Sequence, residues 1–424
     1  MKIVSINTSA RTGGAAIAAY RIAEALNRNS DIEVTLLVQQ GNTNSMVVTT
    51  THTRWKRYLN FIRFAYERFL FFLRESSPQV RFLFSIANTG EDISQHPLVQ
   101  QADIIHLHWV NGGFLSLKDI EKLIRLNKTV VWTLHDMWPF TGGCHHSGSC
   151  NNYQHQCGNC MFLKKPHPHD LSYRIWRRKQ AFLSHADNLI IVTCSQWLHN
   201  CASKSSLFRD KPIYTIPNPI DTRIFTALNK QECREKLGLN PSKKYILFAA
   251  HNVNNYFKGF TYFVEAVRIF ARDYPQNNDL PEIIIAGKVK DASVFTSLEL
   301  PYHLLGVVSP DDMPLVYNAA DLYVTSSLQE NLPNTIMEAM ACSVPVVAFA
   351  VGGIPDLVDH KHNGWLAHFQ SAQSLAEGIR WCLFEANYNQ LSVRSREKIV
   401  REFDLPVIAE KYRQVFERAR NKFF

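Results

Sequence analysis

The stretch of residues 321–356, DLYVTSSLQENLPNTIMEAMACSVPVVAFAVGGIPD, constrains the fold of this chain more than any other. Its pattern predicts a buried strand, a tight loop, a helix, a second buried strand and a glycine-rich loop. The first strand begins at Leu322, the helix opens after Pro333, and the second strand covers residues 344–350. In a parallel α/β sheet, this order places the loop and the start of the helix at the carboxyl edge of the strands, where ligands bind.

The start of this helix is predicted to bind phosphate. The backbone N–H groups around Asn334, Thr335 and Ile336 lack partners within the helix, and the helix dipole also favours an anion there. Two glutamates lie eight positions apart around this turn. Glu338, one turn into the helix, is suited to accept hydrogen bonds from vicinal hydroxyls, as acidic residues do for ribose. Glu330, in the loop, could face the other end of the ligand.

The run ENLPNTIMEAMA, followed by SVPVVA and GGIPD, resembles the E-x7-E signature of family 4 retaining glycosyltransferases of GT-B fold. The resemblance implies a nucleotide-diphospho-sugar donor, with Glu338 on the ribose and Glu330 near the donor sugar and the α-phosphate. The alternative is a βαβ unit whose glutamates are solvated helix charges.

Length and composition are those of a globular protein with about two domains, because 424 residues are too many for one core. No apolar run reaches the roughly 18 residues that a transmembrane helix needs. The first residues, MKIVSINTSARTGG, predict a strand rather than a secretory signal, so we expect a cytoplasmic protein. The formal charge of +9 suggests an anionic partner, such as a nucleotide diphosphate, acidic lipid headgroups or nucleic acid.

Strand and helix patterns alternate in both halves of the chain, which predicts two doubly wound, Rossmann-like α/β domains. The first domain, on the acceptor side, is expected at residues 1–217, because two prolines in IPNPID mark a break after it. The second domain, expected to bind the nucleotide sugar, covers residues 218–405. The GT-B resemblance implies that the domains face each other across a cleft. It also implies that the charged helix at residues 406–424 crosses back to the first domain.

Gly13 and Gly14 join the first strand to the first helix. Paired glycines let a backbone approach a ligand closely. The resemblance implies that this loop lies under the donor diphosphate and sugar, while a plain tight turn is the alternative.

Histidines lie where buried strands of the first domain end. A histidine there can orient a sugar hydroxyl or shuttle a proton near neutral pH. The resemblance favours His135 as the residue that contacts the donor sugar, with Asp136 beside it. His106 and His108 face the same side of a strand, and a satisfied core histidine is the alternative role for one of them.

Lys258, followed by a glycine, comes after the first strand of the second domain. The resemblance implies an arginine and then this lysine, both on the diphosphate, but His251 or Asn252 stands where the arginine is expected. An ammonium group on a pyrophosphate makes a charge-assisted contact; a solvated lysine is the alternative. With the amides near Asn334, Lys258 would stabilise the departing diphosphate. No Asp-x-Asp motif lies in a suitable loop, so we expect no catalytic metal.

A cluster of four cysteines within 17 residues has the ligand type of a structural zinc site. Only one Cys-x2-Cys pair is present, and reduced or redox-labile thiols are the alternative. A reducing compartment argues against disulfides. The run TLHDMWPFTGGCHH with this cluster resembles a polysaccharide-assembly subgroup of the same transferases, including colanic-acid-type enzymes. The predicted zinc ligands are Cys144, Cys150, Cys157 and Cys160.

Residues 54–84 contain seven Arg or Lys and two Glu among many aromatic residues. Leu59, Ile62, Phe69 and Leu73 have helical spacing. A basic amphipathic helix of this kind can lie on an anionic membrane surface. A helix pair packed on the first domain is the alternative. We favour peripheral membrane contact, because the resemblance implies lipid-linked acceptors.

The sequence thus predicts a retaining glycosyltransferase of hexosyltransferase type. It would transfer a sugar from a nucleotide-diphospho-sugar to a polysaccharide or lipid-linked oligosaccharide, in exopolysaccharide, capsule or lipopolysaccharide assembly. One alternative is a nucleotide-sugar epimerase of the same fold. Another is a zinc-knuckle protein that binds nucleic acid, against which the few basic residues at 144–163 count.

Overall fold

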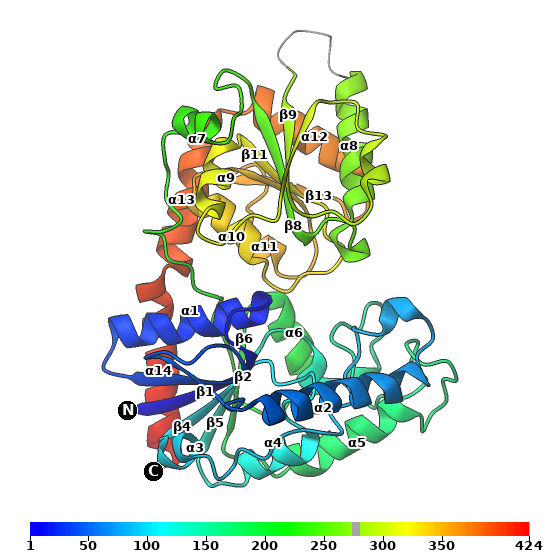
Figure 1. The fold of residues 1–424 in the computed structure, drawn as a ribbon, viewed down its shortest axis with the longest axis vertical. Helices are drawn as coiled ribbons and strands as arrows, with labels where there is room; N and C mark the ends of the chain where they lie inside the picture. Colours follow the sequence, from blue (N-terminus) through cyan, green and yellow to red (C-terminus); the bar gives the residue numbers. More distant parts are fainter. Residues whose placement is uncertain (274–279, 424) are drawn as a thin grey trace. The chain divides into compact units, whose positions relative to one another are not determined.

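The computed structural model describes residues 1–273 and 280–423 and divides into two compact units (Figure 1). The first unit comprises Met1–Pro219 together with Leu405–Phe424, and the second comprises Ile220–Asp404. The chain therefore leaves the first unit two residues after the expected boundary and returns to it for the last helix. Each unit is a parallel sheet with helices packed on it, which confirms the predicted pair of Rossmann-like domains.

The sheet of the first unit has seven parallel strands in the order β3-β2-β1-β4-β5-β6-β7. Its central strands are continuous buried runs, as expected for a sheet covered on both faces. The direction of winding reverses between β1 and β4, so the loops after these strands border a crevice at the carboxyl edge. The strands are β1 (Lys2–Ser9), β2 (Glu33–Gln40), β3 (Val47–Thr49), β4 (Ile104–Leu107), β5 (Thr129–Leu134), β6 (Leu189–Thr193) and β7 (Ile213–Thr215).

The last helix, α14, packs on α1 and on β5 within the first unit. Its buried residues Leu405, Ile408, Tyr412 and Phe416 recur at helical spacing and complete the core on that face of the sheet. The helices of this unit are α1 (Gly14–Asn29), α2 (Arg54–Phe72), α3 (Pro97–Gln101), α4 (Leu117–Ile124), α5 (Leu171–Leu183), α6 (Gln196–Lys204) and α14 (Leu405–Phe423).

The second unit repeats the same winding with six parallel strands in the order β10-β9-β8-β11-β12-β13. Its reversal falls between β8 and β11, which places the loops after these strands at the ligand-binding position. The strands are β8 (Tyr245–Asn252), β9 (Glu282–Lys288), β10 (Tyr302–Gly306), β11 (Leu322–Thr325), β12 (Val346–Phe349) and β13 (Gly364–Ala367). The helices are α7 (Lys230–Lys236), α8 (Phe260–Asp273), α9 (Met313–Ala319), α10 (Asn334–Ala341), α11 (Ile354–Leu357), α12 (Ala372–Arg380) and α13 (Tyr388–Phe403).

The basic aromatic segment forms one 19-residue helix, α2, followed by a short 3-10 turn at Pro78–Val80, rather than a pair of helices. One face of α2 is anchored to the unit. The Glu67 carboxylate is fully buried and accepts hydrogen bonds from the N–H groups of Ile86 at 2.8 Å and Ala87 at 3.1 Å. Over the residues that the structure describes, no helix is long and apolar enough to cross a bilayer.

Candidate functional site

The loops that follow β8 and β11 are joined at the point where the second sheet reverses its winding. The hydroxyl of Ser326 donates a hydrogen bond to the carbonyl of Gly259 at 2.8 Å. The N–H of Leu328 donates to the carbonyl of Phe257 at 2.8 Å. Backbone bonds of this kind fix the two loops as one platform, so the side chains that they carry have defined positions.

Lys258 and Glu330 are brought together by this platform. The Lys258 Nζ lies 2.5 Å from Glu330 Oε1, and the two side chains are 34% and 15% exposed. The sequence assigned the lysine to a diphosphate and the glutamate to the donor sugar and α-phosphate. The structure adds that they contact each other, so the carboxylate holds the ammonium group in place at a partly open surface.

The glycine-rich loop after β12 packs against the backbone of Glu330. Gly352 has φ +58°, and a Cβ atom there would lie 1.7 Å from the Glu330 carbonyl oxygen. The N–H of Gly353 donates to the Asn331 carbonyl at 2.7 Å. A side chain at position 352 would therefore displace the loop that carries Glu330.

Helix α10 begins directly after this loop, with Pro333 at its N-cap and Asn334 and Thr335 in its first turn. No side chain caps this end. Glu338, one turn further on, is 8% exposed, and its Oε2 accepts a hydrogen bond from the Tyr317 hydroxyl at 3.0 Å. Burial and the neighbouring carboxylate raise the pKa of Tyr317 well above its usual value, so this hydroxyl keeps its proton and remains a donor.

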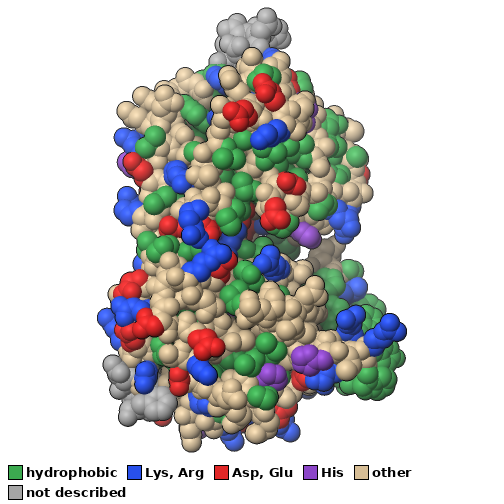
Figure 2. All heavy atoms as spheres, turned by 60° about the vertical axis from the view of Figure 1, so that its left-hand side comes forward, with side chains coloured by type: hydrophobic (Ala, Val, Ile, Leu, Met, Phe, Trp, Pro, Cys, Tyr) green, Lys and Arg blue, Asp and Glu red, His purple; other side chains and the backbone are tan. Residues whose placement is uncertain are grey.

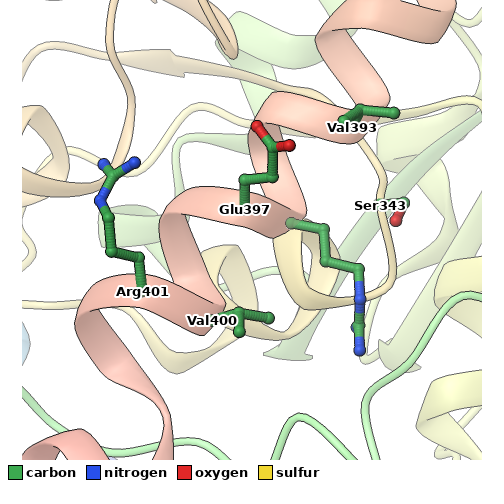
Figure 3. A pocket seen from close by; sticks show the side chains of 6 residues that line it. Ser343, Val393, Glu397, Val400 and Arg401 are labelled. Carbon is green, nitrogen blue, oxygen red and sulfur yellow. The ribbon is translucent and has the colours of Figure 1, made fainter.

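A cavity of about 520 Å³ lies at the opposite end of α10 (Figure 3). It is lined by Ser343, just after that helix, and by one face of α13. An eight-residue helix is about 12 Å long, so this cavity is separate from the turn at Asn334. Its lining includes none of the predicted site residues, and it contributes no ligand contact to the site above.

In the first unit, the end of β1 and the loop after β4 are also hydrogen-bonded to each other. The N–H of Thr8 donates to the Trp109 carbonyl at 2.8 Å, and the N–H of Trp109 donates to Asn7 Oδ1 at 3.0 Å. Gly13 is the N-cap of α1 with φ +92°, and Gly14 is the first residue of that helix. Both are exposed, and a Cβ atom on Gly13 would meet no atom within 4 Å. This loop therefore needs glycine at position 13 for its conformation and not for space.

His135 follows β5, and its Nε2 lies 3.0 Å from His108 Nδ1. Burial lowers the pKa of His135 to about 4, so its ring is neutral at physiological pH. His106 is the satisfied core histidine of this region, because its ring nitrogens bond the hydroxyls of Ser5 at 3.2 Å and Thr133 at 2.8 Å. The other ring nitrogen of His135, Nδ1, lies 3.6 Å from Cys194 Sγ. Because its ring is neutral, His135 does not supply positive charge.

Asp136 accepts three hydrogen bonds beside His135. Its Oδ2 accepts from the Trp109 indole at 3.0 Å and lies 2.6 Å from His145 Nδ1, and its Oδ1 accepts from the Trp138 N–H at 2.8 Å. Burial raises the pKa of Asp136, but the contacts with His145 and Trp138 outweigh it and lower the pKa overall. The sequence did not indicate the Asp136–His145 pair, because spacing alone cannot place two loop residues against each other.

The structure leaves the zinc site at the cysteine cluster a prediction. Over the residues that the structure describes, no three His, Cys, Asp or Glu side chains are arranged to hold a metal ion. Burial raises the pKa of three of the four thiols to about 12. One cysteine lies in the core of the first unit and two pack against it, where they act as small apolar groups. The four predicted ligands are Cys144, Cys150, Cys157 and Cys160, and all are free.

Two family models match the chain. The model described as "Glycosyltransferase Family 4" matches residues 12–224, which is half of the chain, and "Glycosyl transferases group 1" matches residues 229–398. With two Rossmann-like units of GT-B type, the chain belongs to the group 1, family 4 glycosyltransferases.

Curated relatives are similar at low identity. An uncharacterised glycosyltransferase of Haemophilus influenzae is 26% identical over 51% of this chain and 62% of that protein. An uncharacterised glycosyltransferase of Methanocaldococcus jannaschii is 27% identical over 74% of this chain and 82% of its own length. The UDP-Gal:alpha-D-GlcNAc-diphosphoundecaprenol alpha-1,3-galactosyltransferase of Escherichia coli is 25% identical over 48% of this chain and 54% of that enzyme. The chain thus spans less than two thirds of the length of two of these relatives.

Solved structures share the fold along the whole chain. The sucrose-phosphate synthase of Thermosynechococcus elongatus has a TM-score of 0.68 and 18% identity, covering 98% of each chain. Anabaena HepE, solved with UDP-glucose, has a TM-score of 0.60 and 17% identity, covering 99% of this chain and all of the other. At these identities the likeness establishes the GT-B fold.

Proposed function

We propose that this protein transfers a sugar from a nucleoside-diphosphate sugar to a saccharide or lipid-linked saccharide, with retention at the anomeric carbon. One observation carries the proposal: Lys258 and Glu330 form an ion pair at the carboxyl edge of the second sheet, where Glu330 lies on the loop that leads into α10. An ammonium group, a helix N-terminus and a nearby carboxylate suit the phosphates, the leaving group and the sugar hydroxyls of such a donor.

The chemistry requires stabilisation of the diphosphate as it leaves the sugar. Lys258 is the cation proposed to bear on this developing charge, together with the N–H groups at the start of α10. Glu330 orients Lys258 and accepts hydrogen bonds from the donor sugar. Glu338, held by Tyr317, accepts the ribose hydroxyls. His135, neutral because it is buried, is proposed to bind a sugar hydroxyl.

The names of similar proteins support this donor and acceptor class. HepE was solved with UDP-glucose, and the Escherichia coli relative is named for a UDP-galactose donor and a diphosphoundecaprenol-linked acceptor. We infer for this chain a nucleotide sugar as donor and a carrier-lipid-linked saccharide as acceptor, in the assembly of a surface polysaccharide.

A thermal-shift screen of UDP, GDP, ADP and CMP tests the donor first, since a ligand that binds the folded state raises its melting temperature. The nucleotide that stabilises the chain most is selected. A panel of sugars linked to that nucleotide is then tested as donors, with and without a polyprenyl-diphosphate-linked acceptor. Release of nucleoside diphosphate that depends on the acceptor supports the proposal. Conversion of the donor to its epimer without acceptor would instead indicate an epimerase, and no stabilisation by any nucleotide would contradict both activities.

We also propose that α2 lies on an anionic membrane, which would bring the enzyme to lipid-linked acceptors. The face of α2 opposite its buried side carries apolar side chains at helical spacing that are 43–66% exposed. Figure 2 shows hydrophobic side chains beside Lys and Arg side chains at its lower right. Water disfavours a large exposed apolar stripe, so a bilayer interface is a suitable environment for it. The stripe consists of Trp55, Tyr58, Ile62, Tyr66, Phe69 and Leu73.

The charge that accompanies this stripe is smaller than the sequence suggests. Lys56 lies 3.3 Å from Glu91 and Arg63 lies 3.9 Å from the same carboxylate, so these two cations are partly neutralised. Apolar insertion should therefore contribute more than charge. We expect vesicles of phosphatidylglycerol and phosphatidylethanolamine to retain the protein in 0.5 M salt, and the double variant Trp55→Ser, Phe69→Ser to be released. Equal retention of this variant and the wild type would contradict membrane contact through α2.

A further inference from the structure

A hollow in the first unit is built from residues that the site above does not use. It has a volume of about 440 Å³ and lies between the ends of β2 and β3 and the first half of α2. Its lining combines side-chain amides, hydroxyls, aromatic rings and a single charged residue, Arg57. We call it the α2 groove.

Helix α2 supplies one wall of the α2 groove. Arg57, Phe61 and Phe64 are four and three positions apart, so they lie along one face of the helix. Phe61 is 64% exposed and Phe64 is 38% exposed. Both rings therefore present apolar surface to whatever enters the groove.

The floor of the groove contains a buried polar group without a partner. Gln39 is 1% exposed, and its Nε2 donates to the Gly113 carbonyl at 3.1 Å. Because a carbonyl only accepts, the amide nitrogen must face Gly113, and Gln39 Oε1 is left without a hydrogen bond among the described residues. A buried acceptor without a donor is unfavourable.

Hydrogen bonds fix the rest of the floor in advance. The hydroxyls of Thr49 and Thr51 donate to the Gln39 backbone carbonyl at 3.2 and 2.6 Å. The amide of Asn60 donates to the Thr51 hydroxyl at 2.7 Å. A prearranged polar floor loses little conformational entropy when it binds, which favours a rigid polar ligand over a flexible chain.

We propose that the α2 groove binds an acidic sugar residue of the acceptor saccharide; this inference rests on the proposed transferase function. A sugar ring has hydroxyls for the amide and hydroxyl groups of the floor, and an apolar C–H face for Phe61 and Phe64. Among the described residues no carboxylate lines the groove, and Arg57 has no ion pair there, so its guanidinium is available for a sugar carboxylate.

The test uses the full chain without nucleotide on an array of bacterial oligosaccharides, in which each uronate-containing saccharide is paired with its carboxyl-reduced form. The wild type should bind a subset and prefer the acidic members. Phe61→Ala should weaken binding to both forms about tenfold, because one ring contact is lost. Arg57→Gln should remove the preference for the acidic form. Phe72→Ala and Arg54→Gln, which change exposed side chains of the same helix outside the groove, should match the wild type.

Two results would overturn the proposal: no saccharide bound by the wild type, or equal losses in Phe61→Ala and Phe72→Ala. The melting-temperature rise produced by the selected nucleotide is measured on the same variants. Saccharide binding without any nucleotide effect would leave the groove intact and contradict the transferase. A nucleotide effect without saccharide binding would do the reverse.

Discussion

The two units share one winding but differ in how they hold charge at the carboxyl edge of the sheet. In the second unit, Lys258 and Glu330 are charged, paired and partly exposed. In the first unit, His106 and His135 are neutral because burial lowers their pKa values to about 3 and about 4. The same fold thus provides one edge suited to a charged group and another suited to neutral hydroxyls.

The largest effect should come from removing the cation at the carboxyl edge of the second sheet. Lys258→Ala should weaken binding of the selected nucleoside diphosphate and lower kcat/KM by a factor of about 100 to 1,000, because a cation on developing charge is lost. Its loss should be small for the parent nucleoside, which has no phosphates. His135→Ala should lower turnover but leave diphosphate affinity unchanged. Calorimetry measures the affinities for the nucleotide and the nucleoside. Release of nucleoside diphosphate measures turnover.

The exposed Lys236→Ala of α7 is the matched control, and it should behave as the wild type. Equal losses for nucleoside and nucleotide in Lys258→Ala would refute a phosphate contact. A loss of diphosphate affinity in His135→Ala as large as that in Lys258→Ala would remove the distinction between the two edges.

The glycine loops of the two units should also differ, with the larger loss of unfolding free energy in the second unit. Gly352→Ala must relieve both φ +58° and a 1.7 Å approach to the Glu330 carbonyl, so it should cost about 2–4 kcal/mol of unfolding free energy and displace Glu330. Gly13→Ala has φ +92° but open space, so it should cost about 1 kcal/mol. Urea denaturation of the two variants compares them. A larger cost at position 13 would show that its surroundings are more crowded than the structure indicates.

The stability of the first unit should depend on pH through its buried histidines. The folded pKa of His106 is about 3, against about 6.5 in the unfolded chain, so only the unfolded state gains a proton between these values. Stability is therefore lost as the pH falls below about 6.5, by about 1.4 kcal/mol per pH unit for this residue. Six of the eight tryptophans lie in the first unit, so their fluorescence during urea unfolding at pH 6.5 and 5 measures it.

In His106→Gln this slope should decrease by about 1.4 kcal/mol per pH unit. The exposed His362→Gln of the second unit should retain the wild-type slope. Identical slopes in all three proteins would mean that His106 is not held neutral in the folded state.

Local pattern predicted the parts of this molecule that a short stretch of chain determines. The strand–loop–helix unit that carries Glu330 and Asn334 forms as expected, because its apolar runs and Pro333 lie in one continuous short stretch of chain. The short strands β3, β7 and β13 were not predicted. The zinc prediction for the cysteines stays a prediction, because sequence proximity does not decide whether a thiol faces a metal or the core.

Local sequence pattern did not predict the side-chain contacts between different segments of the chain. Lys258 contacts Glu330 only because the loops after β8 and β11 converge at one sheet edge, and His145 contacts Asp136 only because the segment after β5 folds back on itself. The motif identified Glu338 but gave no signal for Tyr317, which comes from a different helix, 21 positions earlier. The one sequence signal for Tyr317 is its place on the helix directly before the motif strand.

Tyr317→Phe should have the smallest effect, and it is the most specific test of the proposed contact between Glu338 and the ribose. The substitution removes the hydroxyl that donates to Glu338 Oε2 at 3.0 Å but keeps the buried ring. Losing one hydrogen bond to a buried carboxylate should cost about 1 kcal/mol, which is a factor of about five in the nucleotide Kd. Because Glu338 is assigned to the ribose, nucleoside and nucleotide should lose affinity by the same factor, in contrast to Lys258→Ala. Tyr256→Phe, with its ring 73% exposed, is the control, and unchanged Kd values in Tyr317→Phe would contradict the ribose role of Glu338 or its dependence on this hydroxyl.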